Sequence, residues 1–241
     1  MPKRKNKIMI DNNKDLCIIR ALELTGEEVD EVLELSTDGI PVAVDCEGLD
    51  YKIIVDNFSG EEDDFFATIS AVKKVIGSKI YSEDDETLEQ KVVGLCLEKG
   101  IRIAIAESLT GGMLSSRIVN VSGSSGVLNE AIVTYTNASK VKRLHVKLST
   151  LKQYGAVSEE TAREMAQGLK NKDNNFVVST TGCAGPASDE KDTPVGLVFV
   201  GIAGDGFVDV FRLELEGERN VIRKSVTDKA LYLLLDYISK F

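Results

Sequence analysis

The sequence predicts an α/β protein, namely a three-layer α/β/α sandwich with a mixed, mostly parallel sheet, preceded by a small N-terminal α+β domain. From Glu86 onward, apolar strand-like runs alternate with helical patterns, which is typical of a sheet covered by helices on both faces. The acidic stretch from Ser82 to Glu86 interrupts the pattern. We therefore expect one domain over residues 1–82 and a second over residues 83–241.

The second domain is expected to begin with a helix whose start carries the acidic stretch, because negative charge is favoured at a helix N-terminus. Ser158 is a suitable N-cap for one of the later helices. Gly204-Asp205-Gly206 is a strong turn signal and predicts an antiparallel hairpin. The helices are expected at 86–99, 111–120, 139–144, 159–170 and 219–239, and the strands at 102–106, 131–136, 176–180, 195–203 and 208–215.

The first domain shows a mixed pattern, with helices expected at 26–35 and 61–76 and extended segments at 40–46 and 52–57. The second helix has an apolar face, because its large apolar residues recur at three- and four-residue steps. These residues are Phe65, Phe66, Ile69, Val72, Val75 and Ile76. The section thus has apolar surface of its own to bury.

Composition excludes several classes of function. The formal net charge is -10 and no basic stripe is present, which argues against a nucleic-acid partner. No apolar run is long enough to cross a bilayer and none follows the basic start as a signal peptide would, so we expect a cytoplasmic protein without a membrane partner. The cysteines are scattered and His145 is the single histidine, so neither a metal site nor a histidine base is expected.

The first candidate constellation is the segment Ala106-Glu107-Ser108-Leu109-Thr110-Gly111-Gly112, which follows an apolar strand and opens a helix. Such an elbow places Ser108 at the carboxyl edge of the sheet. The helix-start N–H groups near Gly111 and Gly112 are expected to be free to hold an anion or a developing oxyanion. A helix cap without chemical function is the alternative interpretation.

The second constellation is Thr134-Tyr135-Thr136-Asn137-Ala138-Ser139-Lys140, again between a strand and a helix. Burial beside such a site can lower the pKa of a lysine until its free amine deprotonates a serine. A solvated surface lysine is the alternative, but Ser108 is expected at the equivalent edge of an adjacent strand. We therefore predict that Lys140 and Tyr135 face the same edge as Ser108.

The third constellation is Ser179-Thr180-Thr181-Gly182-Cys183-Ala184-Gly185-Pro186, which also follows an apolar strand. Cys183 has no histidine partner nearby, so a buried structural thiol is the preferred interpretation. Arg219 and Arg223 open the last helix and could form a fork on a phosphate, or else make surface ion pairs.

Two further motifs follow the same order along the chain, Gly155-Ala156-Val157-Ser158-Glu159-Glu160-Thr161-Ala162 and Pro194-Val195-Gly196. Together, the ordered motifs resemble the C-terminal domain of the competence/damage-inducible protein A family, known as nicotinamide mononucleotide deamidase. The resemblance covers residues 84–241. Residues 19–81 more weakly resemble the KH-like middle domain of full-length members, and the nucleotide-pyrophosphatase domain of those members has no counterpart in this sequence.

The resemblance implies Ser108 as nucleophile, Lys140 as its base and Tyr135 in proton handling or orientation. It further implies metal-independent hydrolysis of a nucleotide carboxamide with release of ammonia. We expect no cofactor, and the sequence leaves open whether the protein forms a homo-oligomer. Substrate-binding roles are expected for Thr110, Gly111, Gly112, Asn137, Thr181, Gly182, Gly185 and Arg219.

Some positions depart from the family pattern. The family usually has a glycine pair where this chain has Glu130-Ala131, a glycine-rich stretch where it has Ala187-Ser188-Asp189, and a lysine where it has Thr193. These changes concern the substrate pocket and leave the proposed catalytic residues in place. A catalytically inactive nucleotide sensor or interaction module is therefore the alternative function. RNA binding is disfavoured because the first section is acidic and has no suitable Gly-x-x-Gly loop.

Overall fold

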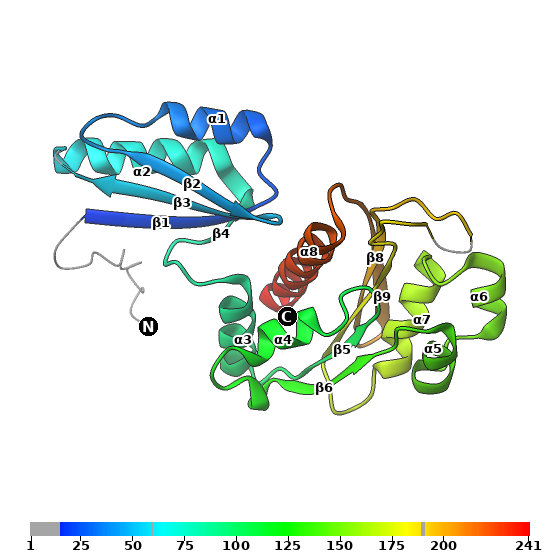
Figure 1. Cartoon of the computed structure of the whole chain (residues 1–241). Coiled ribbons are helices and arrows are strands. Elements are labelled where there is room, and N and C mark those ends of the chain that lie inside the picture. Colours follow the sequence, from blue (N-terminus) through cyan, green and yellow to red (C-terminus); the bar gives the residue numbers. More distant parts are fainter. Residues whose placement is uncertain (1–14, 59, 189–190) are drawn as a thin grey trace. The chain divides into compact units, whose positions relative to one another are not determined.

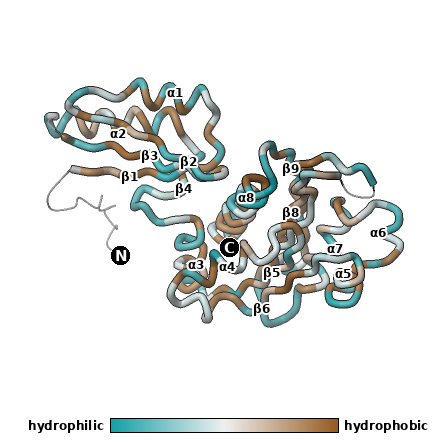
Figure 2. The backbone as a smooth tube through the Cα atoms, in the orientation of Figure 1, coloured by the Kyte–Doolittle hydropathy of each residue, from teal (hydrophilic) through white to brown (hydrophobic). Residues whose placement is uncertain are grey.

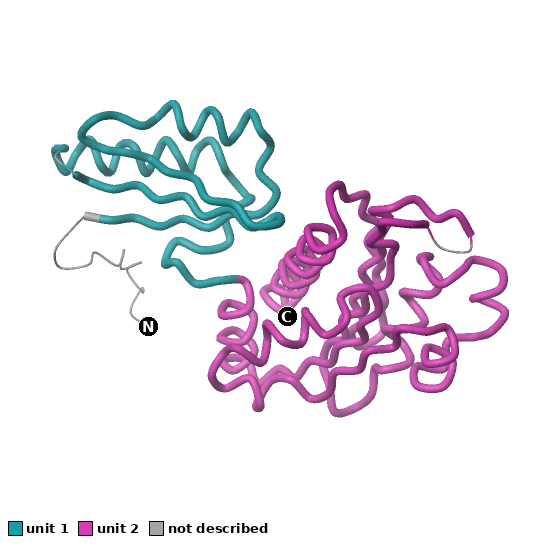
Figure 3. Tube along the Cα trace, viewed as in Figure 1, with its two compact units in different colours: residues 1–87 teal, residues 88–241 magenta. Residues whose placement is uncertain are grey.

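The structure, a computed structural model, describes residues 15–58, 60–188 and 191–241. The chain divides into two compact units, residues Met1–Thr87 and Leu88–Phe241 (Figure 3). We describe each unit separately.

The first unit is a four-stranded antiparallel sheet with two helices against one face (Figure 1). The strand order is β2-β3-β1-β4. Alternate residues of the strands, such as Ile19 and Ile53, are buried under Phe65 and Val72 of the second helix. The elements are β1 (Asp15–Leu22), α1 (Gly26–Glu34), β2 (Val42–Glu47), β3 (Asp50–Asn57), α2 (Glu62–Ile76), a 3₁₀ turn (Gly77–Lys79) and β4 (Ile80–Ser82).

The second unit is a five-stranded sheet between two helical layers, which confirms the predicted three-layer class (Figure 1). Its elements are α3 (Leu88–Lys99), β5 (Ile103–Glu107), α4 (Met113–Val119), a 3₁₀ turn (Ser124–Gly126), β6 (Leu128–Val133), α5 (Asn137–Leu144), α6 (Leu148–Tyr154), α7 (Glu159–Leu169), β7 (Phe176–Gly182), β8 (Leu197–Gly204), β9 (Phe207–Glu214) and α8 (Arg219–Lys240). One layer holds α3, α4 and α8, and the other holds α5, α6 and α7.

The sheet has the order β6-β5-β7-β8-β9. β5 pairs in parallel with both β6 and β7, whereas β8 pairs antiparallel with β7 and β9. Four of the five strands consequently point the same way, with β8 reversed. The predicted hairpin between the last two strands is confirmed.

Apolar residues concentrate on the central strands, where the tube of Figure 2 is brown. β7 is buried along nearly its whole length and β5 entirely, as expected for strands covered on both faces. Between the sheet and α7, Ala104, Ala106 and Val177 contact a cluster that includes Met165 and Leu169. The core therefore fixes the ends of β5 and β7, which carry the site.

One expected strand ends earlier than predicted, and β1, β4 and α6 were not predicted. β6 ends at Val133 rather than at residue 136, because its partner β5 ends at Glu107, whose carbonyl oxygen accepts the last ladder bond from Thr134 N–H, and because Thr136 caps α5. α6 was not predicted from its short, uncapped sequence. β1 was also missed, because apolar residues such as Ile18 and Ile19 occupy both of its faces and weaken the period-two signal.

Candidate active site

Three loops meet at one edge of the second unit's sheet. β5, β6 and β7 are parallel, so their carboxyl ends lie together (Figure 1). Ser108 follows β5, residues 134–136 follow β6, and Thr181 and Gly182 end β7. The topology thus brings the predicted constellations to the same place, as the rule for open α/β sheets leads one to expect.

Lys140 and Ser108 are in direct contact at this edge. Lys140 lies in α5, one turn after its first residue, and is only 1% exposed. Its Nζ donates to Ser108 Oγ at 2.8 Å and to the Thr134 carbonyl oxygen at 2.7 Å. Ser108 is itself buried, with 8% exposure. A serine hydroxyl and a lysine amine at this distance satisfy the geometry of a nucleophile and its base.

The environment of Lys140 shifts its protonation equilibrium toward the neutral amine. Burial lowers the pKa of Lys140 from its ordinary value of 10.5 to about 8. Within the described residues, no carboxylate forms an ion pair or hydrogen bond with its Nζ that would restore the charged form. About a tenth of the molecules then carry a neutral Lys140 at pH 7, compared with a negligible fraction for a solvated lysine.

The start of α4 is occupied by a buried carboxylate. Glu107 is fully buried, and its side chain accepts hydrogen bonds from the N–H groups of Gly112 (2.8 Å), Leu114 (3.2 Å) and Ser115 (3.0 Å). It also accepts from the Ser115 hydroxyl at 2.7 Å. Gly111 N–H donates to Ser108 O at 3.1 Å. The expectation that the Gly111 and Gly112 amides are free to hold an anion is therefore wrong, because the protein's own groups occupy them.

Arg223 fixes the remaining part of the elbow. Its Nε donates to Leu109 O at 3.0 Å and its Nη2 to Thr110 O at 2.8 Å. Arg223 was considered as part of a phosphate fork, whereas here its guanidinium binds backbone carbonyls. In the described part of the chain, the N–H groups of Leu109 and Thr110 donate no hydrogen bond. These two amides adjoin Ser108 and are the donors still available there.

Tyr135 and Arg219 lie together at the rim of the site. Arg219 Nη2 donates to the Tyr135 hydroxyl at 2.9 Å, and Nη1 donates to Gly185 O at 2.6 Å. Tyr135 is 59% exposed. Among the described residues, its hydroxyl makes no hydrogen bond with Ser108 or Lys140. The structure thus joins Tyr135 to Arg219 rather than to the buried pair.

The other predicted binding residues make structural contacts. Thr181 Oγ1 donates to Ala156 O at 2.6 Å, and the hydroxyls of Thr110 and Thr180 lie 2.8 Å apart. A Cβ on Gly182 would lie 2.6 Å from Val198 Cγ2, so close packing requires that glycine. Asn137, the first residue of α5, lines a cavity.

Cys183 is a buried thiol whose Sγ lies 3.5 Å from Ala187 O, and His145 is an exposed residue at the end of α5.

The residues to which the sequence analysis assigned no role are Glu107 and Thr134, whose carbonyl oxygen accepts from Lys140. The signal for Glu107 was its place between an apolar strand and a glycine-led helix, where a carboxylate can cap the amides.

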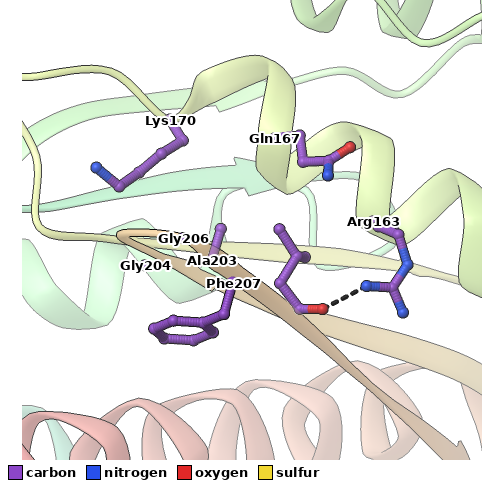
Figure 4. A pocket seen from close by; sticks show the side chains of 8 residues that line it. Arg163, Gln167, Lys170, Ala203, Gly204, Gly206 and Phe207 are labelled. Atoms are coloured by element: carbon purple, nitrogen blue, oxygen red, sulfur yellow. Dashed lines mark hydrogen bonds between the residues drawn. The ribbon is translucent and has the colours of Figure 1, made fainter.

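Two cavities of the second unit lie near charged side chains. One, of about 690 Å³, is lined by residues from the start of α5, from α6 and the loop after it, and by Ser188 and Lys191 of the loop after β7. The other, of about 340 Å³, lies between α7 and the β8–β9 hairpin (Figure 4). Ala203 pairs with Val177 near the start of β7, so the smaller cavity is at the opposite end of the sheet from Ser108.

The described residues contain no group of three or more His, Cys, Asp or Glu side chains that could hold a metal ion. No helix in the same ranges is long and apolar enough to cross a membrane.

Comparison with known proteins identifies the family. The family model described as CinA C-terminal domain matches residues 85–238. A CinA-like protein of Fusobacterium nucleatum is 49% identical over 175 residues, which are 70% of this chain and 42% of that protein. The structure of competence/damage inducible protein CihA from Agrobacterium tumefaciens has a TM-score of 0.59 and 35% identity, covering 62% of this chain and 92% of that one.

A CinA superfamily protein from Escherichia coli likewise has a TM-score of 0.59 and 30% identity, covering 65% of this chain and 94% of that one. The chain spans about 40% to 55% of the length of curated relatives from Alkaliphilus oremlandii and a Thermoanaerobacter strain. Because the family model covers more than half of the sequence, the chain belongs to the CinA C-terminal domain family.

Proposed function

We propose that the second unit is a Ser/Lys amidohydrolase that converts nicotinamide mononucleotide to nicotinate mononucleotide and ammonia. The observation that carries the proposal is the buried contact of 2.8 Å between Lys140 Nζ and Ser108 Oγ. The choice of substrate rests on the family resemblance of the Ser108, Tyr135 and Lys140 motifs.

In the first half of the reaction, the Ser108 hydroxyl attacks the carboxamide carbon and Lys140 accepts its proton. The developing oxyanion is stabilised by the N–H groups of Leu109 and Thr110, since the amide of the residue after the nucleophile commonly serves this purpose. Collapse of the intermediate breaks the C–N bond. Lys140 returns the proton to the leaving nitrogen, and ammonia departs.

In the second half, water attacks the acyl group on Ser108 while Lys140 again accepts a proton. The ester bond breaks, and the proton on Lys140 returns to Ser108 Oγ. The carboxylic acid that forms loses its own proton to solvent, so the product leaves as a carboxylate. A lysine that is neutral in part of the molecules near pH 7 can perform both transfers. For Tyr135, its bond to Arg219 supports a role in orienting substrate at the rim.

The test is release of ammonia from a panel of pyridine-nucleotide amides, with Ser108→Ala and Lys140→Arg as variants. Both should lose turnover by at least about a thousandfold, because loss of a nucleophile or its base removes most covalent catalysis. Lys140→Arg keeps the charge but supplies a group that does not deprotonate. Tight nucleotide binding by the unaltered protein without ammonia release from any amide would support the sensor function instead.

We further propose a KH-like assignment for the first unit and a cytoplasmic location. The antiparallel sheet with two helices on one face supports the former. The scarcity of basic residues relative to acidic ones supports a role other than nucleic-acid binding.

A further inference from the structure

Arg223 is held in place by the helix that carries it. It lies in the second turn of α8, and its neighbours Ile222 and Val226 are fully buried. Further along the helix, the buried Asp228 accepts a hydrogen bond from Arg117 of α4, which joins α8 to the helix that follows the elbow. The guanidinium of Arg223 is therefore positioned from outside the loop that contains the proposed nucleophile.

One chain of hydrogen bonds runs from Arg223 through a single peptide group. Its Nε donates to Leu109 O at 3.0 Å. The same peptide group carries the Thr110 N–H, and because this peptide bond is trans, the N–H points away from the side on which Arg223 binds. A hydrogen bond to the carbonyl oxygen fixes the plane of the peptide group and makes its N–H a stronger donor.

A second chain of hydrogen bonds runs through two peptide groups. Nη2 of Arg223 donates to Thr110 O at 2.8 Å. The N–H of the same peptide group, that of Gly111, donates to Ser108 O at 3.1 Å. The Ser108 carbonyl in turn belongs to the peptide group that carries the Leu109 N–H. Both amides proposed to stabilise the oxyanion thus end a chain of hydrogen bonds that starts at one guanidinium.

The two amides at the ends of these chains have no acceptor of their own. Thr110 is fully buried and Leu109 is 4% exposed, yet within the described residues neither N–H donates a hydrogen bond. Buried N–H groups in proteins are nearly always paired. Both amides lie within two residues of Ser108, so an oxyanion on the carbon bonded to Ser108 Oγ would supply the acceptor.

The contact with two consecutive carbonyls requires the shape of an arginine. A guanidinium presents Nε and Nη2 along one planar edge, which a lysine ammonium cannot reproduce. A third bond, from Nη1 to Asn220 Oδ1 at 3.1 Å, fixes the rotation of the plane. Gly111 has a φ of 60°, and a Cβ there would lie 3.4 Å from Nη2 of Arg223. The glycine thus gives the loop its turn and leaves room for the guanidinium.

We propose that Arg223 is a positioning residue for the oxyanion hole, which orients and polarises the Leu109 and Thr110 amides through the peptide groups of the elbow. The proposal rests on the proposed function and adds a residue to its mechanism. In this role Arg223 does not contact the reacting atoms. Its loss should therefore weaken stabilisation of the transition state and leave substrate binding unchanged.

The test compares Arg223→Met and Arg223→Lys with Arg212→Met, which removes an exposed arginine of β9 that pairs with Glu214. Loss of one oxyanion donor commonly lowers kcat about a hundredfold or more. Arg223→Met should accordingly lower kcat for nicotinamide mononucleotide at least about tenfold and change KM less than about twofold. Arg223→Lys keeps the charge without the planar edge and should lower kcat at least about fivefold. Arg212→Met should match the unaltered protein.

The pH profile separates this role from a general loosening of the site. In Arg223→Met, the midpoint of the kcat/KM profile should stay near pH 8, because the surroundings of Lys140 are unchanged. A loosened site would expose Lys140 to solvent and move the midpoint towards 10.5. Such a move, an unchanged kcat, or a loss that lies wholly in KM would overturn the proposal.

A second reaction keeps this result apart from the choice of substrate. With p-nitrophenyl acetate, Ser108 Oγ bonds to the acetyl carbon, Lys140 takes the hydroxyl proton and p-nitrophenolate leaves, so no nucleotide pocket is needed. Acetylation of Ser108, followed by mass spectrometry with Ser108→Ala as the blank, should be at least about tenfold slower in Arg223→Met.

The outcomes of this second reaction are distinct. If the unaltered chain releases no ammonia from any amide but acetylation is slowed as expected, hydrolysis of the nucleotide amide is refuted and the role of Arg223 stands. If Ser108 is acetylated equally fast in the unaltered chain and in Arg223→Met, or in neither, the role of Arg223 is refuted whether or not ammonia is released.

Discussion

Replacement of Lys140 by methionine should change how the stability of the protein depends on pH. In the folded chain, burial lowers the pKa of Lys140 from 10.5 to about 8, whereas in the unfolded chain the amine is solvated. Between these two pH values the unfolded state binds one more proton than the folded state. The free energy of unfolding contributed by Lys140 therefore rises with pH across this window.

The size of the effect follows from the two pKa values. At about 1.4 kcal/mol per pKa unit, the charged form of Lys140 is penalised by about 3 kcal/mol below pH 8. Because pH 9.5 lies short of 10.5, about 2 kcal/mol of this should be recovered between pH 7 and 9.5. Methionine has similar length and no ionisable group. The substitution also removes the hydrogen bonds to Ser108 and Thr134. This lowers the free energy of unfolding of Lys140→Met by the same amount at each pH, so it cancels when the two pH values are compared.

The measurement is urea unfolding of the full chain at pH 7 and pH 9.5, followed by circular dichroism, with the transition of the second unit analysed. The unaltered protein should gain about 2 kcal/mol relative to Lys140→Met between the two pH values. Lys142→Met is the control, because that lysine is exposed on the same helix and its effect should not vary with pH. The burial argument would be refuted if the difference in free energy of unfolding between Lys140→Met and the unaltered protein stayed constant within about 0.5 kcal/mol between the two pH values.

Three further outcomes are expected. The kcat/KM for amide hydrolysis should rise about tenfold per pH unit below pH 8 and level off above it, because the base must be neutral; a flat profile from pH 6 to 9 would remove Lys140 from that role. Glu107→Gln should lower kcat at least about tenfold in enzyme assays with little change in KM, and should lower the free energy of unfolding by about 2 kcal/mol in urea, because an amide cannot accept all four hydrogen bonds. An unchanged kcat would mean that the conformation of the elbow does not depend on this cap. Gly168→Ala should destabilise the second unit by about 2 kcal/mol or more in thermal unfolding, because the added Cβ would lie 1.8 Å from Leu144 O. Gly94→Ala on α3, where the added Cβ meets open space, should be neutral or slightly stabilising. Similar effects of the two substitutions would contradict the close approach of α5 and α7.

The sequence was sufficient for the class of the fold and for most of its elements, because these depend on local periodicity and turn chemistry. The β8–β9 hairpin is a case of this kind, since Gly204-Asp205-Gly206 specifies the turn directly. The end of β6 was less predictable. Val133 and Tyr135 continue an apolar alternation, yet the chain leaves the sheet after Thr134, because β5 ends at Glu107 and the Thr134 N–H to Glu107 O bond is the last of the ladder. The end of the neighbouring strand, rather than the local pattern, sets that boundary.

For the site, sequence order and the fold rule placed Ser108 and Lys140 at one edge, but not the distance between them. That distance depends on how far α5 is displaced by packing against α7, where Gly168 lets Leu144 approach. The occupation of the α4 start was also beyond local reasoning. Both a free amide and an amide bound to Glu107 are consistent with the motif, and only the side-chain direction of Glu107 decides between them.

The Thr134 carbonyl explains how a lysine can act in both protonation states without moving. A neutral amine has two N–H groups and one lone pair, whereas the ammonium has three N–H groups. The Thr134 carbonyl accepts one N–H in either state, at 2.7 Å, and so holds Nζ in place. The lone pair of the neutral form can then face Ser108 Oγ and accept its proton, after which the new N–H points at the position from which ammonia leaves. A single backbone acceptor, fixed where β6 ends, thus orients the base for each of the proton transfers proposed.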